Sequence, residues 1–290
     1  MPGLNLETWN AALARVIAQI NHPTALRELV EGLSTGVTFD TWYAVFFRTN
    51  AAPVEVDHSQ RWTMRQRYVE GPYLLDPFYT TFINGAEEGC YLMRDIAPQD
   101  FRQSRYYLEY YSPWGAGDEV GYLLRISDEV TAHLSFGRKK PNSRFNKADV
   151  KTLEIASPVV HEVFRHVWSQ LQRDVGESDA FRTDFHVRIT QAFRSFGTSV
   201  LTDREGEITH LLLRGHSAKS IARLLDISPG TVRNHMKSIY SKLEISSQSE
   251  LFGLFFEALS NLEGDISVDP LVSLWGGTDD EKARPGSRIG

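Results

Sequence analysis

The sequence predicts two domains of different fold class, an α/β domain in which helices flank a mixed sheet, followed by an all-α domain of four short helices. A length of 290 residues is typical of two domains. Aromatic and β-branched runs alternate with helical patterns in the first part, and closely spaced helix-capping residues follow residue 200. We therefore expect an N-terminal domain over 1–173, a linker over 174–199, the helical domain over 200–262 and a disordered tail over 263–290.

The N-terminal domain combines helical and extended patterns. One apolar stripe predicts a helix over residues 5–20, and a second helical segment follows Pro23. The runs 42–48 and 54–58 are typical of strands, and 119–138 is typical of a hairpin. These patterns predict a sheet of about five strands.

Two more helices are expected between and after these strands. Residues 98–111 have a helical pattern, and residues 146–172 predict a long helix that is broken or kinked near Pro158. Helices, about five strands and a closing long helix resemble a sensor domain of the PAS or GAF type.

Each helix of the second domain begins at a residue that can cap it, because a side-chain oxygen there can accept from the free amides of the first turn. The capping residues are Thr202 with Glu205, Ser217, Ser228 with Pro229, and Ser247 with Glu250. The spacing of these caps predicts four helices joined by tight turns.

The third of these helices has two different faces. The inner face is apolar and consists of Val232, Met236, Ile239 and Leu243. The outer face carries Arg233, Asn234 and Lys237. Two short helices joined by a tight turn, the second with a cationic outer face, are typical of a helix-turn-helix. The second helix of this motif enters the DNA major groove. The alternative is a solvated helical hairpin whose charges only keep it soluble.

The local charge favours DNA as the partner. The whole chain has a formal net charge of -6. Within residues 214–242, Asp226 is the one acidic residue among several basic residues, namely Arg214, Lys219, Arg223, Arg233, Lys237 and Lys242. The basic surface is therefore confined to the helix-turn-helix, where phosphates would lie.

The stretch 201–259 contains a specific set of motifs. They are Leu201-Thr202-x-Arg204-Glu205-x-Glu207, Gly215-x-Ser217, Ile221-Ala222, Leu225-x-Ile227-Ser228, Thr231-Val232-x-Asn234-His235 and Ile239-Tyr240-x-Lys242-Leu243. This stretch resembles the C-terminal DNA-binding domain of LuxR-type regulators. The resemblance implies that Arg233, Asn234 and Lys237 approach base edges. It also implies phosphate contacts for four residues, namely Ser217, Lys219, Thr231 and Lys242.

Asp226 departs from the family pattern, which usually has glycine in this turn. Aspartate adopts left-handed conformations less easily than glycine but more easily than most residues. We expect the turn to survive at a small energetic cost.

The fourth helix points to a homodimer. Phe252 and Phe256 lie four residues apart, off the inner face that Leu251, Leu254, Phe255 and Leu259 form. The resemblance implies that this helix makes the contact of a symmetric dimer on an inverted-repeat site in double-stranded DNA. RNA polymerase is a candidate further partner. The alternative is that both rings pack under the N-terminal domain.

A group of aromatic residues and acids in the N-terminal domain predicts a small-molecule site. Its members are Trp62, Tyr68, Tyr73, Asp76, Phe78, Tyr106, Trp114 and Glu119. Aromatic rings around a carboxylate suit an amide N–H or a cationic amine. The stretch Tyr68 to Pro77 resembles the signature of autoinducer-binding domains, although the spacing differs, and this implies that Asp76 accepts from a ligand amide. The alternative is that the rings are core residues and that Asp76-Pro77 begins a turn.

Other functional classes fit the sequence poorly, and we expect no enzyme and no cofactor. His161 and His166 are five residues apart, so they point in different directions on a helix and cannot share a zinc ion. No glycine-rich phosphate loop is present. No apolar run is long enough to cross a membrane, and a single cysteine, Cys90, favours a cytoplasmic location.

Two readings of the whole chain remain. In the first, a small molecule in the N-terminal domain controls a DNA-binding transcriptional regulator. In the second, the N-terminal domain is a protein-interaction or dimerisation module without a ligand. A buried Asp76 beside tyrosines would favour the first, and a domain filled by those rings would favour the second.

Overall fold

The computed structural model describes residues 5–22, 24–59, 68–69, 71–98, 101–104, 106–112, 117–139, 144–174, 177–260 and 268–276. It divides into two compact units. The first unit contains residues 1–97 and 110–185, and the second contains residues 98–109 and 186–290.

The first unit is built on a five-stranded sheet with the order β2-β1-β5-β4-β3. Its strands are β1 (Thr41–Arg48), β2 (Val54–His58), β3 (Gly89–Leu92), β4 (Asp118–Arg125) and β5 (Val130–Arg138). Every pairing between them is antiparallel. The predicted α/β class is therefore confirmed, but the sheet is antiparallel where we expected a mixed one. The hairpin between β4 and β5 and the turn after β1 join neighbours directly, which only antiparallel strands allow.

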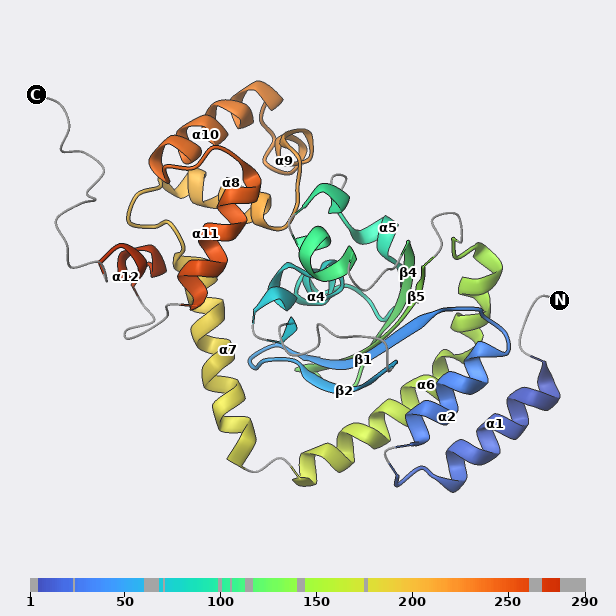
Figure 1. Cartoon of the computed structure of the whole chain (residues 1–290). Helices are drawn as coiled ribbons and strands as arrows, with labels where there is room; N and C mark the ends of the chain where they lie inside the picture. The colour runs from blue at the N-terminus through green and yellow to red at the C-terminus, as the bar shows by residue number, and fades with distance from the viewer. Residues whose placement is uncertain are drawn as a thin grey trace, which may run out of the picture. The chain divides into compact units, whose positions relative to one another are not determined.

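The central strands are buried on both faces, and their side chains alternate between two layers. On β4 and β5, residues such as Tyr122 and Phe136 lie in the main apolar core. Three helices cover that face, namely α1 (Leu6–Ala18), α2 (Ala25–Ser34) and α6 (Lys147–Asp174), as Figure 1 shows. The predicted break at Pro158 is absent, because α6 runs through it without interruption. Packing of α6 against the sheet holds this helix together despite the missing N–H.

Short helical segments cover the opposite face of the sheet. They are η1 (Pro72–Leu75), α4 (Pro77–Ile83) and α5 (Met93–Ile96). Gly121 of β4 permits close packing there, since a Cβ at this position would lie 2.7 Å from the His133 ring and 3.0 Å from the Phe78 ring. Because side chains alternate, Glu119, His133 and Ser135 face this side.

The helix predicted over 98–111 is confirmed only in part. The described residues there form two short helical segments in place of one helix, the 3-10 helix η2 (Phe101–Gln103) and the π-helix η3 (Tyr107–Tyr111). Between them the Ser104 hydroxyl donates to Phe101 O and accepts from Tyr107 N. A serine side chain that bonds the backbone in this way competes with a continuous helix.

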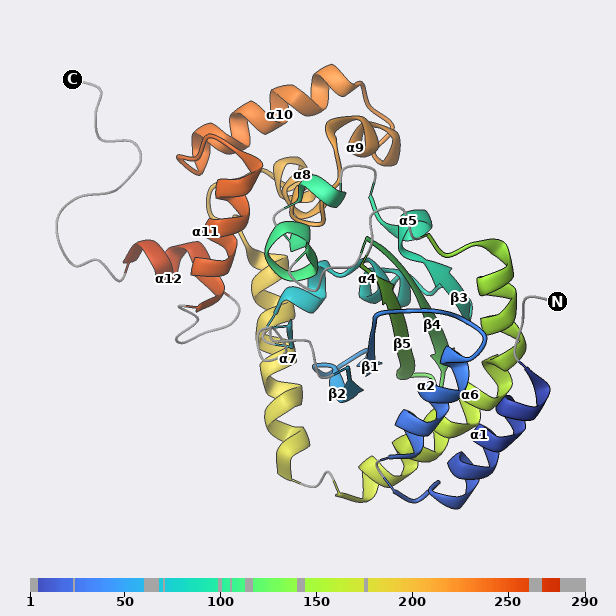
Figure 2. The same cartoon turned by 45° about the vertical axis from the view of Figure 1, so that its right-hand side comes forward.

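The second unit contains a bundle of short helices (Figure 2). These are α8 (Asp203–Leu213), α9 (Ala218–Leu224), α10 (Pro229–Lys242) and α11 (Gln248–Ser260), preceded by α7 (Glu177–Ser195), which spans much of the predicted linker. Each predicted cap of α8, α9 and α10 is confirmed, including the reciprocal capping box of Thr202 and Glu205. Ser247 likewise accepts from Glu250 N at the start of α11.

The expectation of a disordered tail over 263–290 is wrong for one segment, because α12 (Pro270–Gly276) forms there. Leu271 is fully buried, and the Asp269 carboxylate accepts from the backbone N–H groups of Gly197, Ser199 and Leu271. These bonds tie the segment to the turn before α8. The sequence did not predict this segment, because its composition is rich in Gly, Asp and Ser. Only the fold brings Asp269 to Gly197 and Ser199.

Among the helices that the structure describes, none is both long and apolar enough to cross a bilayer.

Candidate DNA interface and effector site

A tight turn sets α10 against α9. Asp226 has a φ of 51°, so it adopts the left-handed conformation that the sequence predicted for this turn. The N–H of the next residue, Ile227, donates to Ala222 O at 3.0 Å and closes the end of α9. Val232 and Ile239 of α10 are fully buried, so the opposite face of this helix points away from the core.

The three residues predicted to read bases lie on that outer face. The side chains of Arg233, Asn234 and Lys237 are all exposed. A guanidinium and an amide can each pair with two atoms of one base edge, and the ammonium group adds a third donor. The arrangement can therefore present several hydrogen-bonding groups to a groove.

The predicted phosphate contacts lie at helix starts, with one exception. The Ser217 hydroxyl caps α9, and Thr231 lies in the first turn of α10, where its N–H donates to Ser228 Oγ. Lys219 is exposed beside Ser217. Helix N-termini attract anions, so these three positions suit phosphates. Lys242 is different, because its Nζ lies 2.6 Å from Glu205 Oε2 in an ion pair within the bundle.

Glu205 is the polar centre of the helical bundle, and the sequence revealed only part of its role. Its carboxylate accepts from Lys242, from the Ser238 hydroxyl and from Thr202 N. Burial acts to raise the pKa of Glu205, but these hydrogen bonds outweigh it and lower the pKa to about 2. The capping box was readable from local spacing, whereas the contacts with α10 were not.

The two phenylalanines of α11 differ from the expectation. Phe252 is only 3% exposed, and its ring centroid lies 4.6 Å from that of Phe256. The apolar surface of α11 is wider than its predicted inner face, since Phe252 and Ala258 are buried along with Leu251 and Phe255. The assumption that both rings are exposed is therefore wrong for Phe252.

Asp76 lies in the first unit at the start of α4 and is 8% exposed. Its Oδ2 accepts from the Tyr68 hydroxyl at 2.7 Å, and its Oδ1 accepts from Phe78 N at 2.8 Å as the cap of α4. Tyr73 is fully buried, and its ring centroid lies 6.4 Å from that of Tyr68. The structure thus brings Tyr68, Tyr73, Asp76 and Phe78 together.

The other members of the predicted ligand set separate into three groups. Trp62 and Trp114 lie outside the described residues. Tyr106 belongs to the second unit, where its ring centroid lies 6.0 Å from that of Phe101. Glu119 lies in the first unit and interacts electrostatically with Asp76.

Glu119 is buried on the face of the sheet that α4 covers. It is 4% exposed, and the hydroxyl groups of Ser135 and Tyr111 hydrogen-bond to it. Burial, together with the charge of Asp76, raises the pKa of Glu119 to about 8. An acid with such a perturbed pKa is typical of functional sites.

Ser135, which hydrogen-bonds to this acid, was not among the residues predicted for the site, and neither was His133, which lies on the same face of β5. Burial lowers the pKa of His133 to about 4, so its ring is neutral and stacks against Phe47 with centroids 5.0 Å apart. The alternation of β5 would have placed Ser135 and His133 on one face, but the identity of that face depends on strand pairing.

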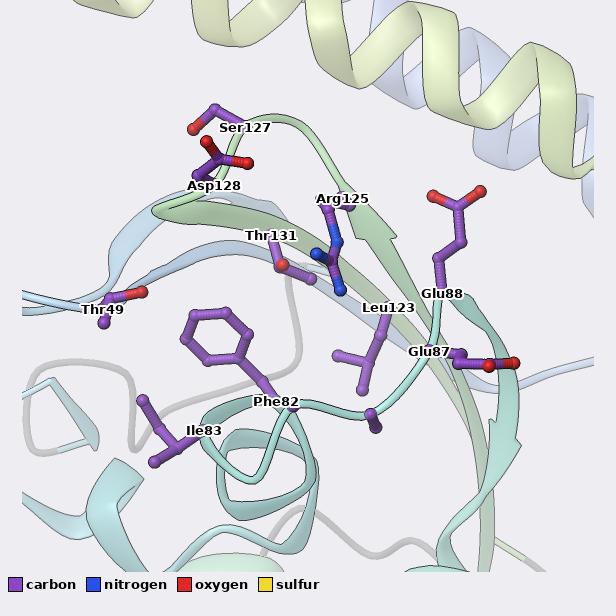
Figure 3. A pocket seen from close by; sticks show the side chains of 12 residues that line it. Thr49, Phe82, Ile83, Glu87, Glu88, Leu123, Arg125, Ser127, Asp128 and Thr131 are labelled. Carbon is purple, nitrogen blue, oxygen red and sulfur yellow. The ribbon is translucent and has the colours of Figure 1, made fainter.

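A separate pocket of about 200 Å³ lies between the end of α4 and the β4–β5 hairpin. Figure 3 shows Phe82 and Leu123 inside it and charged groups, among them Glu88 and Arg125, around it. The described members of the predicted ligand set do not line this pocket.

Comparison with known proteins identifies a family model for the DNA-binding part and relatives that match larger parts of the chain. The model of the "Bacterial regulatory proteins, luxR family" matches residues 199–255. A putative HTH-type transcriptional regulator in the exeN 3' region of Aeromonas salmonicida is 34% identical over 196 residues, which are 67% of this chain and 100% of that relative.

Two further similarities extend into the N-terminal part. The monoamine regulon transcriptional regulator of Klebsiella aerogenes is 26% identical over 211 residues, covering 72% of this chain and 81% of that protein. The crystal structure of the VqsR ligand-binding (LBD) domain from Pseudomonas aeruginosa aligns with a TM-score of 0.50 and 28% identity, covering 55% of this chain and 94% of that one.

Proposed function

Because this chain belongs to the LuxR family of DNA-binding transcriptional regulators, we propose that a small molecule held in its first domain controls how it binds DNA. The family is one of regulators and not of enzymes.

In this proposal α10 lies in the major groove of double-stranded DNA. Arg233, Asn234 and Lys237 read base edges from its exposed face, while Ser217, Lys219 and Thr231 hold phosphates at helix starts. Lys242 contacts a phosphate only if its ammonium group also bonds the phosphate while it stays paired with Glu205, or if the ion pair with Glu205 breaks. The protein acts in the cytoplasm, where bacterial DNA lies, and RNA polymerase is a further partner.

We also propose that the regulator binds an inverted repeat as a homodimer through α11. Phe256 is partly exposed and supports Phe252 from the same helix. Two-fold symmetry of the protein then matches two-fold symmetry of the operator.

The observation that carries effector control is the pair of buried acids, Asp76 and Glu119, beside tyrosine rings. Such convergent polar groups within an aromatic environment are typical of small-molecule sites. They suit an effector that carries an amide or an amine. A relative that regulates a monoamine regulon agrees with that chemistry.

A second function is favoured by the saturation of Asp76. Both of its oxygens accept hydrogen bonds within the domain, and the neighbouring rings of Tyr73 and Tyr79 pack edge to face with centroids 4.9 Å apart. In this alternative the first domain is a filled interaction module, and a protein partner controls the regulator.

DNA binding with and without small molecules distinguishes these functions. Selection from random DNA with the full chain yields its operator, and the affinity for that operator is then measured with a panel of lactones, amines and aromatic acids. Effector control predicts a change of at least tenfold with one class, about 1.4 kcal/mol of coupling. Specific DNA binding that no class alters contradicts effector control and leaves the interaction module.

A further inference from the structure

The pocket beside the β4–β5 hairpin follows from the alternation of side chains along the sheet. Tyr122 and Leu124 of β4 lie in the main core, so Leu123 and Arg125 point to the opposite face, which α4 covers. Arg125 is paired with Thr131 of β5, so their side chains are neighbours at this end of the sheet. Strand register thus places an apolar side chain, a hydroxyl group and a guanidinium together in the pocket lining.

The pocket is small and its inner lining is apolar. Phe82 and Ile83 of α4 lie opposite Leu123 of β4, and the Phe82 ring is stacked on Phe47 with centroids 5.9 Å apart. The volume is about 200 Å³, equal to roughly seven water molecules at their share of the liquid. The pocket therefore suits a molecule smaller than a typical drug.

Charged side chains of both signs surround this apolar lining. Among the described lining residues Arg125 is the cation, and Glu87, Glu88 and Asp128 are the acids. All four side chains are exposed. Figure 3 shows Arg125 between Asp128 and Glu88, with its guanidinium directed toward Leu123. Within the described part of the chain, Arg125 forms no ion pair with any of these acids.

The two signs of charge restrict the class of ligand. A hydrocarbon would leave the guanidinium without a partner. A simple carboxylate would pair with Arg125 but would also meet three acids, and a simple amine would meet the guanidinium. A zwitterion avoids both conflicts, because its carboxylate fits the planar guanidinium and its ammonium group donates to an acid.

We propose that this pocket binds a small zwitterion with an apolar side chain, of the α-amino acid class. The carboxylate of the ligand accepts from the guanidinium of Arg125, and its apolar side chain packs on Phe82 and Leu123. Its ammonium group donates to Glu88, which extends alongside Arg125 in Figure 3, whereas Glu87 extends away. The site is separate from Asp76 and Glu119, so this inference does not rest on the effector control proposed for them.

The test removes one feature of the ligand at a time. L-leucine and L-phenylalanine are titrated into the full chain by calorimetry, beside leucinamide without the carboxylate, N-acetyl-leucine without the ammonium group, and glycine without the apolar side chain. We expect leucine or phenylalanine to bind, and each analogue to bind at least about tenfold more weakly.

Two variants assign the charged contacts separately. Arg125→Gln should abolish the preference for leucine over leucinamide, because the partner of the carboxylate is lost. Glu88→Gln should abolish the preference for leucine over N-acetyl-leucine, because the partner of the ammonium group is lost. A loss of structure would instead weaken all of these molecules alike.

Matched controls keep the result specific. Arg144→Gln and Glu7→Gln make the same chemical changes at exposed positions outside the pocket lining, and they should leave the affinity for leucine unchanged. Because Arg125 and Glu88 are exposed, their variants should unfold at the same temperature as wild type.

The outcomes separate this inference from the proposed function. If neither leucine nor phenylalanine binds, or if leucinamide and N-acetyl-leucine bind as tightly as leucine, the zwitterion site is wrong. Unchanged preferences in Arg125→Gln and Glu88→Gln would also overturn it. Effector control is measured by DNA affinity with lactones, amines and aromatic acids, so its failure or success is independent of these results.

Discussion

At the scale of single residues, the two buried glutamates show how position decides what a carboxylate does. Glu205 is surrounded by donors from two helices, and its pKa falls to about 2, whereas Glu119 is surrounded by acids and hydroxyl groups, and its pKa rises to about 8. Both are almost fully buried. The difference lies in the charge of their neighbours, because desolvation acts on both in the same direction.

Glu119 should make the unliganded protein less stable as pH rises. Its folded pKa of about 8 exceeds the ordinary value of 4.5, so the folded state binds more protons than the unfolded state between these values, and the free energy of unfolding falls across that window. Glu119→Gln removes this pH-dependent loss of stability. We therefore expect its free energy of unfolding at pH 8 to exceed that of wild type by roughly 2–4 kcal/mol. Urea unfolding of both proteins at pH 5 and pH 8 measures this difference in unfolding free energy. The same difference at both pH values would refute the raised pKa of Glu119.

Glu205 should show the opposite dependence. Its folded pKa lies below the ordinary value of 4.5, so its stabilisation is present above that pH and is lost as pH falls toward 2. Glu205→Gln should cost about 1–3 kcal/mol at pH 7, because charge-assisted hydrogen bonds from Lys242 and Ser238 are lost. Glu207→Gln, at a more exposed ion pair, is the matched control and should change the unfolding free energy by less than about 0.5 kcal/mol.

At the scale of elements, the turn between α9 and α10 depends on a single unusual backbone conformation. Asp226 has a φ of 51°, a region where most side chains are strained. Asp226→Val should therefore destabilise the helical unit by about 1–2 kcal/mol, whereas Asp226→Gly should leave its stability unchanged or raise it slightly. Thermal unfolding of both variants measures this. A valine variant as stable as the glycine variant would show that the turn does not need the left-handed conformation.

At the scale of the whole molecule, residues that contact phosphates and residues that read bases should have different effects on DNA binding. Lys219→Ala should weaken matched and scrambled sites alike, because a phosphate contact carries no sequence information. Arg233→Ala should cost about 1–3 kcal/mol on the matched site and also reduce the preference over scrambled DNA. Fluorescence anisotropy on both DNAs at a fixed salt concentration provides the measurement. Equal losses on both DNAs for Arg233→Ala would remove its base-reading role.

The helical domain was predictable from the sequence because its determinants are local. Caps such as Thr202 with Glu205 and Ser228 with Pro229 define helix starts within four residues, and the apolar stripe of α10 follows from helical periodicity alone. The strands and the aromatic group around Asp76 were predicted for the same reason. Tertiary packing keeps α6 unbroken at Pro158, and at Ser104 a side chain divides the predicted helix into two shorter helical segments.

What the sequence by itself determined is thus the class of both domains, the exposed polar face of α10 and the resemblance to the LuxR family. Tertiary structure alone decided that Glu119 lies near Asp76 and that Lys242 forms an ion pair with Glu205. Glu119 meets the charge of Asp76 because β4 lies beneath the start of α4, and Lys242 meets Glu205 because α10 packs on α8. Contacts between residues so far apart depend on strand register and helix packing, which no local pattern specifies.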